Sequence, residues 1–178
     1  MNFIPSPNKS SRKGKRPTHI VIHAMGGSFN GSISWFSNPK SKVSAHYLVS
    51  KTGESVQMVQ DKDKAWHVNK ANAWTIGIEL EDGFFTKLGN GKQVLSRDCR
   101  TDLNWTTDPM LKEAARITAE IMNKYAIPMS ELKTRVIGHD SVLMRKYGNN
   151  HKDPGKYFPW DTFYSLVRGY ENNSDDNN

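Results

Sequence analysis

The sequence predicts a single α/β domain, and three observations favour it. Residues 18–25 form an apolar, β-branched run without a charge in its middle, which is typical of a strand covered on both faces. Residues 43–60 predict two strands joined by a turn at 51–54, as in an antiparallel hairpin. Residues 107–125 and 159–170 carry apolar side chains at helical spacing. A chain of 178 residues is long enough for one such domain with its own core.

The two ends of the chain differ in composition from the rest. Residues 1–17 hold five basic side chains among serines, glycine and prolines, which predicts a flexible basic arm rather than a packed element. Residues 171–178 are polar and low in complexity, which predicts a disordered tail. The folded domain is therefore expected over residues 18–170.

Shorter elements are expected inside this domain. Residues 32–37 predict a short helix that is stopped by the following Asn-Pro pair. Residues 83–106 are rich in Gly, Asn, Arg and Asp without periodicity, and they predict a long surface loop. Residues 136–140 form a second short β-type run that ends in a histidine and an aspartate, and a short helical piece is expected around residues 141–147.

Residues 75–80 alternate strictly between two kinds of side chain. Ile76, Ile78 and Leu80 point to one face of the predicted strand, while Gly77 and Glu79 point to the other. A glutamate beside a glycine on one face indicates open space above the sheet. The alternative is an ordinary solvent-exposed strand face.

The overall charge and the cysteine content limit the classes of function. A net charge of +7 favours a polyanionic partner such as nucleic acid, anionic lipid or an anionic cell-wall polymer, although the excess charge could serve solubility alone. The single Cys99 excludes an internal disulfide and a thiolate-rich metal site. No apolar run approaches the ~20 residues of a membrane span, and no secretory signal is recognised at the start.

Three potential metal ligands stand at the ends of predicted elements. They are His23, His139 and Asp153, and two imidazoles with one carboxylate and an open fourth position form the ligand set of a hydrolytic zinc site. Ligands so far apart in sequence argue against a structural zinc finger, whose ligands cluster tightly. They favour a catalytic zinc ion that the fold assembles, which requires both imidazoles neutral and Asp153 ionised.

A zinc hydrolase also needs a group that takes the proton of water and one that stabilises the oxyanion. Glu79, which faces the open space beside Gly77, suits the first task. His151 lies two residues before Asp153, and in an extended segment these two side chains face the same side. His151 is therefore expected to face the metal cavity as the oxyanion stabiliser.

Seven short motifs carry a resemblance to a known family. The chain resembles the zinc-dependent N-acetylmuramoyl-L-alanine amidases of the type 2 amidase family, which includes the peptidoglycan recognition proteins. The motifs occur in the family's order: Ile-Val-Ile-His at 20–23, Trp-Phe at 35–36, Val-Ser-Ala-His-Tyr at 43–47, Ala-Trp-His at 65–67, Ile-Gly-Ile-Glu at 76–79, Gly-His at 138–139 and Lys-Asp-Pro-Gly at 152–155.

The resemblance implies a central mixed β-sheet flanked by helices, with Zn²⁺ held by His23, His139 and Asp153. It implies hydrolysis of the amide that joins the lactyl group of N-acetylmuramic acid to L-alanine in peptidoglycan. Glu79 matches the family's catalytic glutamate. His67 falls on a family motif and is predicted to line the substrate groove.

His151 departs from the family pattern. Many relatives carry a lysine two residues before the last ligand. A protonated imidazole can donate a hydrogen bond to the oxyanion as an ammonium does, but it loses its proton as the pH rises through its pKa. We therefore expect activity with a narrower alkaline limit than that of a lysine enzyme.

Two other classes of function are possible. A peptidoglycan-binding receptor of the same fold that no longer cleaves would typically lack a zinc ligand, and all three are present here. Nucleic-acid binding would rest on charge alone, because no helix-turn-helix or aromatic-interleaved basic motif is found. The expected partners are bacterial peptidoglycan and anionic wall polymers, without nucleic acid or membrane, and the expected state is a monomer.

The resemblance and the missing secretory signal together favour one cellular setting. We expect a phage endolysin or prophage lytic enzyme that stays in the host cytoplasm until a holin releases it to the cell wall.

Overall fold

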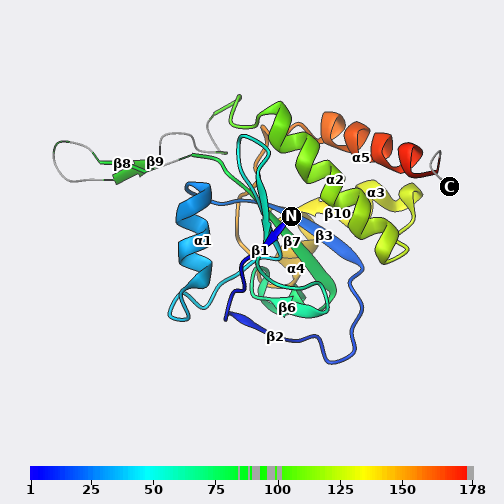
Figure 1. Cartoon of the computed structure of the whole chain (residues 1–178), viewed down its shortest axis with the longest axis horizontal. Helices are drawn as coiled ribbons and strands as arrows, with labels where there is room; N and C mark the ends of the chain where they lie inside the picture. The colour runs from blue at the N-terminus through cyan, green and yellow to red at the C-terminus, as the bar shows by residue number, and fades with distance from the viewer. Residues whose placement is uncertain (84, 88, 90–92, 96–98, 100–101, 176–178) are drawn as a thin grey trace.

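The centre of the molecule is a mixed sheet of six strands in the order β1-β5-β4-β7-β3-β10 (Figure 1). A computed structural model describes residues 1–83, 85–87, 89, 93–95, 99 and 102–175. The strands are β1 (Asn2–Phe3), β3 (His19–Ala24), β4 (Tyr47–Val49), β5 (Ser55–Gln57), β7 (Thr75–Leu80) and β10 (Val136–Gly138). β3 is parallel to both of its neighbours, β7 and β10, while β4 and β5 form the antiparallel hairpin. The predicted mixed sheet flanked by helices is confirmed.

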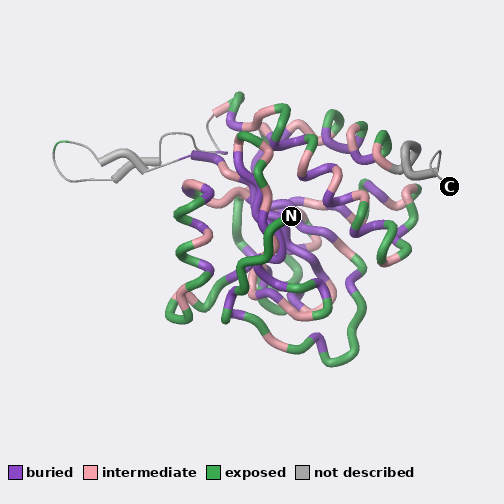
Figure 2. Tube along the Cα trace, in the orientation of Figure 1, coloured by how far each residue is buried: buried purple, intermediate pink, exposed green. Residues whose placement is uncertain are grey.

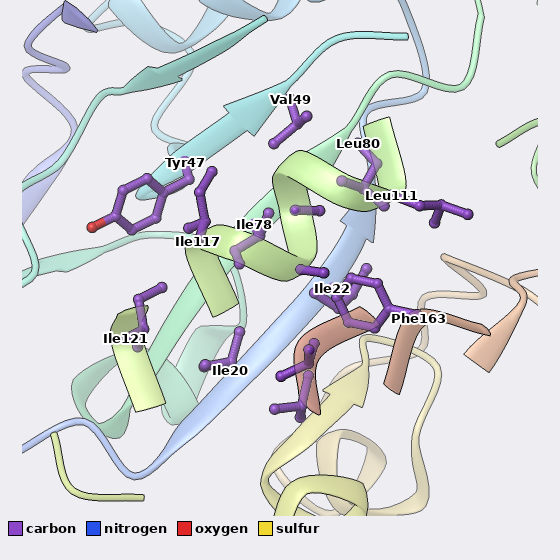
Figure 3. Packing of buried hydrophobic residues seen from close by; sticks show 14 of the residues in the cluster. Ile20, Ile22, Tyr47, Val49, Ile78, Leu80, Leu111, Ile117, Ile121 and Phe163 are labelled. Carbon is purple, nitrogen blue, oxygen red and sulfur yellow. The ribbon is translucent and has the colours of Figure 1, made fainter. Parts of the chain in front are cut away.

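Two long helices, α2 (Asp108–Lys124) and α5 (Trp160–Asp175), pack together across one face of the sheet (Figure 1). Alternate residues of β3 and β7 point to this face, and Figure 3 shows Ile20, Ile22 and Ile78 against Ile117 of α2 and Phe163 of α5. All of these side chains are at most 1 % exposed. Burying each one contributes roughly 1.5–3 kcal/mol, so this cluster is the main source of stability.

The opposite face of the sheet carries shorter elements. α1 (Phe29–Ser37) packs Phe29 and Phe36 against Leu48 of β4. The 3-10 helix η1 (Asn69–Trp74) and helix α4 (Val142–Lys146) pack around Val21 of β3. β3 is thus covered on both faces, as its uninterrupted apolar run predicts, and purple buried residues fill the middle of the trace in Figure 2. Two short elements, η2 (Met129–Glu131) and α3 (Leu132–Arg135), connect α2 to β10.

The N-terminal segment is packed, so the prediction of a flexible arm over residues 1–17 is wrong. β1 joins the edge of the main sheet, and β2 (Lys9–Ser11) pairs antiparallel with β6 (Asp63–Ala65). Arg12 is only 4 % exposed. Its guanidinium donates hydrogen bonds to four main-chain carbonyls, those of Asp61, Asn72, Ala73 and Thr75. Composition alone could not reveal these acceptors, because they belong to segments far along the chain.

Two further expectations need correction. The region 83–106 is not simply a surface loop, because β8 (Phe85–Lys87) pairs antiparallel with β9 (Gln93–Leu95), and Cys99 and Trp105 are buried in the core. Helix α5 continues to Asp175, so residues 171–175 are helical instead of disordered. The rest of the predicted tail, 176–178, and residues 84, 88, 90–92, 96–98 and 100–101 lie outside the described residues. Within the described part of the chain, none of the helices has the length and apolar character needed to cross a bilayer.

The buried His46 should make the stability of the protein depend on pH. Its Nδ1 accepts a hydrogen bond of 3.0 Å from the backbone N–H of Gly77. Burial, together with the positive charge of Arg12, lowers the pKa of His46 to about 3. An unfolded chain would protonate this imidazole near pH 6.5. Below about pH 6.5 the imidazole is therefore protonated in the unfolded chain but stays neutral in the folded protein. As a result, the free energy of unfolding decreases as the pH falls from about 6.5 to about 3.

We expect His46 to contribute a slope of up to about 1.4 kcal/mol per pH unit to the free energy of unfolding in that range. Urea unfolding from pH 7 down to pH 4 should show a shallower slope for His46→Gln than for the wild type. Equal slopes would mean that His46 does not remain neutral in the folded protein.

Candidate metal centre and active site

The candidate site lies at the carboxyl ends of three neighbouring parallel strands. The register of β3 and β7 pairs His23 with Glu79, so both side chains point to the same face of the sheet. β10 ends one residue before His139, whose backbone N–H donates a hydrogen bond to the carbonyl of Ile22. The parallel pairing of β3 and β10 therefore places His139 beside His23.

Asp153 reaches this site from the segment that follows α4. Its backbone carbonyl accepts a hydrogen bond from Asp140, and its Oδ2 lies 3.3 Å from the backbone nitrogen of Ala24. Gly138 makes room for this segment, because a Cβ atom there would lie 2.8 Å from Cδ of Pro154. The carboxylate of Asp153 thus lies across the ends of β3 and β10.

The three side chains converge on one point. Nδ1 of His23 lies 3.2 Å from Oδ2 of Asp153, and Nδ1 of His139 lies 3.4 Å from Oδ1. One possible ligand atom from each residue lies within 4.8 Å of the other two. Ligand atoms around a tetrahedral zinc ion, bound at about 2.0–2.2 Å, are about 3.4 Å apart. The spacing to Asp153 therefore fits such an ion.

His139 supplies an independent test of this fit. Its Nε2 is 3.1 Å from Oδ1 of Asn149, whereas its buried Nδ1 forms no hydrogen bond with any described residue. An unpaired buried polar atom is costly. Here it faces a carboxylate oxygen, and a cation between the two would satisfy both atoms.

The protonation states suit metal binding and base catalysis. Burial, and then the neighbouring His139, lowers the pKa of His23 to about 4, so this imidazole is neutral at neutral pH. Glu79 is 8 % exposed, which excludes the alternative of a solvent-exposed strand face. Burial, followed by the charges of Asp153 and Asp82, raises the pKa of Glu79 well above its usual value. A carboxylate with a raised pKa accepts a proton from water more readily.

A cavity of about 950 Å³ opens over these residues. The candidate ligands and Glu79 form its floor, and aromatic residues such as Trp35 and Trp66 contribute to its walls. The side chain of Trp35 is well exposed, so a flat apolar surface borders the polar floor. A bound cation, a base and a roomy cavity are the parts that metal-assisted hydrolysis needs.

Comparison with known proteins places the chain in a family. Residues 13–156 match the family described as N-acetylmuramoyl-L-alanine amidase (Amidase_2). The chain belongs to this amidase family. N-acetylmuramoyl-L-alanine amidase A of Achromobacter lyticus is 35 % identical over 92 % of this chain and 90 % of its own length.

Solved structures agree on the amidase fold. The hydrolase AmiA of Staphylococcus aureus, in complex with its ligand, aligns with a TM-score of 0.69 at 19 % identity, over 95 % of this chain and 82 % of AmiA. The Escherichia coli amidase AmiD was solved with the substrate anhydro-N-acetylmuramic acid-L-Ala-D-γ-Glu-L-Lys. It aligns with a TM-score of 0.63 at 22 % identity, over 88 % of this chain and 58 % of AmiD.

The two remaining candidate residues of this amidase lie in different surroundings. His151 is at the rim of the cavity with a side chain that is 64 % exposed, 3.5 Å from Asp153, and its ring stacks on that of His139. His67 also borders the cavity, but its Nδ1 is 2.9 Å from Nε2 of His23. A role in binding substrate stays a prediction for His67, whereas its contact with a candidate ligand was not anticipated.

Gly77 explains how His67 comes so close to His23. The sequence indicates open space above the sheet at this glycine, and the ring of His67 occupies that space. A Cβ atom on residue 77 would lie 2.5 Å from Nδ1 of His67. Asn149, the partner of His139, was also missed, because the polar Gly-Asn-Asn stretch in which it lies is typical of a simple link.

Gly77→Ala should therefore disturb the site. We expect the added methyl group to push the His67 ring from its place and to lower the free energy of unfolding by about 1–3 kcal/mol. Urea unfolding measures this effect. Gly169→Ala on α5 is the matched control, because its Cβ would meet nothing within 4 Å, and a helical alanine should stabilise by up to about 1 kcal/mol. Wild-type stability in Gly77→Ala would contradict the tight contact.

Proposed function

We propose that this protein is a zinc-dependent peptidoglycan hydrolase that cleaves the amide between the lactyl group of N-acetylmuramic acid and L-alanine of the stem peptide. The observation that carries the proposal is the convergence of His23, His139 and Asp153 beside the buried Glu79, on the floor of an open cavity. Membership of the amidase family and the substrate bound to the related AmiD support the choice of bond.

His23 and His139, as neutral imidazoles, and Asp153, as a carboxylate, would hold the zinc ion and leave a fourth position open. When bound, zinc polarises a carbonyl oxygen and lowers the pKa of water to roughly 7. Glu79 takes a proton from the attacking water, and its raised pKa suits it to hold that proton and then pass it to the departing nitrogen of L-alanine. A protonated His151, at the rim of the same cavity, would donate its N–H to the oxygen that becomes negatively charged.

Digestion of purified peptidoglycan tests this proposal. The expected products are new L-alanine amino termini without new reducing sugars, and a chelator should abolish their release until zinc is restored. Reducing sugars would identify a glycosidase instead. Full activity of a chelator-treated, metal-free preparation would overturn the zinc assignment.

The proposed role of His151 predicts a change in the pH profile. His151→Ala should lower kcat by about 10²-fold, because an oxyanion donor is lost. His151→Lys should recover much of this loss and move the alkaline limit upward, since an ammonium keeps its proton to a higher pH than an imidazole. Rates measured from pH 6 to pH 10 distinguish the three proteins. Undiminished wild-type turnover at pH 10 would argue against a protonated imidazole in this step.

A further inference from the structure

Each candidate ligand histidine must present a lone pair at Nδ1 if it is to bind the ion. A neutral imidazole carries its single N–H on either Nδ1 or Nε2, and only the Nε2–H tautomer leaves Nδ1 free to bind a metal. The Nε2 atoms of His23 and His139 both point away from Asp153 and into hydrogen-bonded networks. These networks determine where the proton sits.

Asn149 determines the tautomer of His139. This asparagine is 1 % exposed, and its Nδ2 donates hydrogen bonds to the carbonyls of Val68 and Met144. The reversed amide would bring its oxygen against both carbonyls, so the orientation is fixed. Oδ1 therefore faces Nε2 of His139 at 3.1 Å, and since an amide oxygen only accepts, His139 must carry its proton on Nε2.

Thr75 and His67 determine the tautomer of His23. The fully buried hydroxyl of Thr75 lies 3.0 Å from the carbonyl of Ala71, which can only accept, so the single hydroxyl proton is used there. The same oxygen lies 3.1 Å from Nε2 of His67 and must accept its N–H. Nδ1 of His67 is then a lone pair that accepts the Nε2–H of His23 at 2.9 Å.

We propose that the turn made by η1 and its flanking residues, Val68 and Thr75, sets the tautomer of both ligand histidines, one through Asn149 and the other through Thr75 and His67. Both networks include a carbonyl of this turn. Thr75 donates to that of Ala71, and Asn149 donates to that of Val68 as well as to that of Met144 outside the turn. Asn149, His67 and Thr75 are thus positioning residues that aim two Nδ1 lone pairs at one ion beside Asp153. This inference rests on the proposed zinc function and gives His67 a positioning role beside its predicted place in the substrate groove.

Two variants of His67 whose new side chains resemble each other in shape test the proposal. In His67→Asn, the amide oxygen can take the place of Nδ1, since both atoms are attached to Cγ. The leucine of His67→Leu is close to asparagine in size and shape but has no hydrogen-bond acceptor. Competition with a chromophoric chelator gives the zinc dissociation constant of each full-length protein. We expect His67→Asn to stay within about 3-fold of the wild type and His67→Leu to bind about 10–100-fold more weakly, as is typical when a partner of a metal ligand is lost.

A second pair of variants acts one step further from the metal. Thr75→Ser keeps the hydroxyl, and Thr75→Val removes it without changing the size of the side chain. Long-range ¹H–¹⁵N NMR spectra of the zinc-free proteins report which nitrogen of His23 carries the proton. The wild type and Thr75→Ser should show the Nε2–H tautomer, and Thr75→Val should show a mixture of both.

Two results would overturn the proposal. One is equal zinc affinity in His67→Leu and His67→Asn, and the other is a proton on Nδ1 of His23 in the zinc-free wild type. If His67→Leu does not fold, the NMR spectra of Thr75→Ser and Thr75→Val still test the proposal. A wild-type protein that binds no zinc would overturn the proposed function instead, and the NMR spectra would still decide the tautomer.

Discussion

Replacing Asp153 with asparagine is expected to lower kcat/KM on peptidoglycan by on the order of 10³-fold, with a matching loss of zinc affinity. Asp153 is the only charged member of the proposed ligand set, and each of its oxygens faces Nδ1 of one candidate ligand histidine, at 3.2 Å for His23 and 3.4 Å for His139. Asparagine keeps the shape but removes the charge that balances the cation. Metal-ion catalysis is worth several kcal/mol, and each 1.36 kcal/mol is a factor of ten in rate.

Zinc binding measured by chelator competition, together with the rate of release of L-alanine amino termini, checks this expectation. Asp161→Asn is the matched control, because this aspartate lies on the outside of α5 with a side chain that is 95 % exposed. Asp161→Asn should behave as the wild type. An Asp153→Asn protein that keeps wild-type zinc affinity would show that the metal, if bound, is held elsewhere.

Glu79→Gln should lower kcat by about 10²–10⁴-fold while zinc affinity remains near that of the wild type. Glutamine preserves the size of the side chain but cannot take a proton from water. Oε1 of Glu79 is 4.0 Å from Nδ1 of His23, so Glu79 neighbours the ligand set without belonging to it. A loss of rate with the metal retained separates a proton-transfer role from a ligand role.

Although Glu79→Gln should lower the rate, it should raise the free energy of unfolding of the zinc-free protein. The pKa of Glu79 is raised in the folded zinc-free protein, so the folded state binds this proton more tightly than the unfolded state does. At neutral pH the buried negative charge therefore costs stability, and removing it should increase the free energy of unfolding. Urea unfolding with a chelator present measures this, with Glu120→Gln on α2, an exposed position, as control. A Glu79→Gln protein that is both fully active and less stable would contradict the proposed role.

Local sequence patterns were sufficient to predict the central strands and the long helix α2. The uncharged β-branched run of β3 and the strict alternation of β7 predicted which side chains enter the core, because burial on one or both faces of a strand imposes those patterns. The helical spacing of apolar residues predicted α2 in the same way. His23, near the end of β3, and His139, directly after β10, were singled out because ligands gather at the carboxyl ends of strands in open α/β sheets.

The sequence by itself therefore determined the α/β architecture, the faces of its main strands and the set of polar residues at their ends. Only the tertiary structure decided that Arg12 anchors the N-terminal segment, that the ring of His67 fills the space above Gly77 and that Asn149 contacts His139. The physical reason is common to all three. Each depends on hydrogen-bond partners or free space contributed by segments distant in the chain, and no local pattern of residues records where those segments meet.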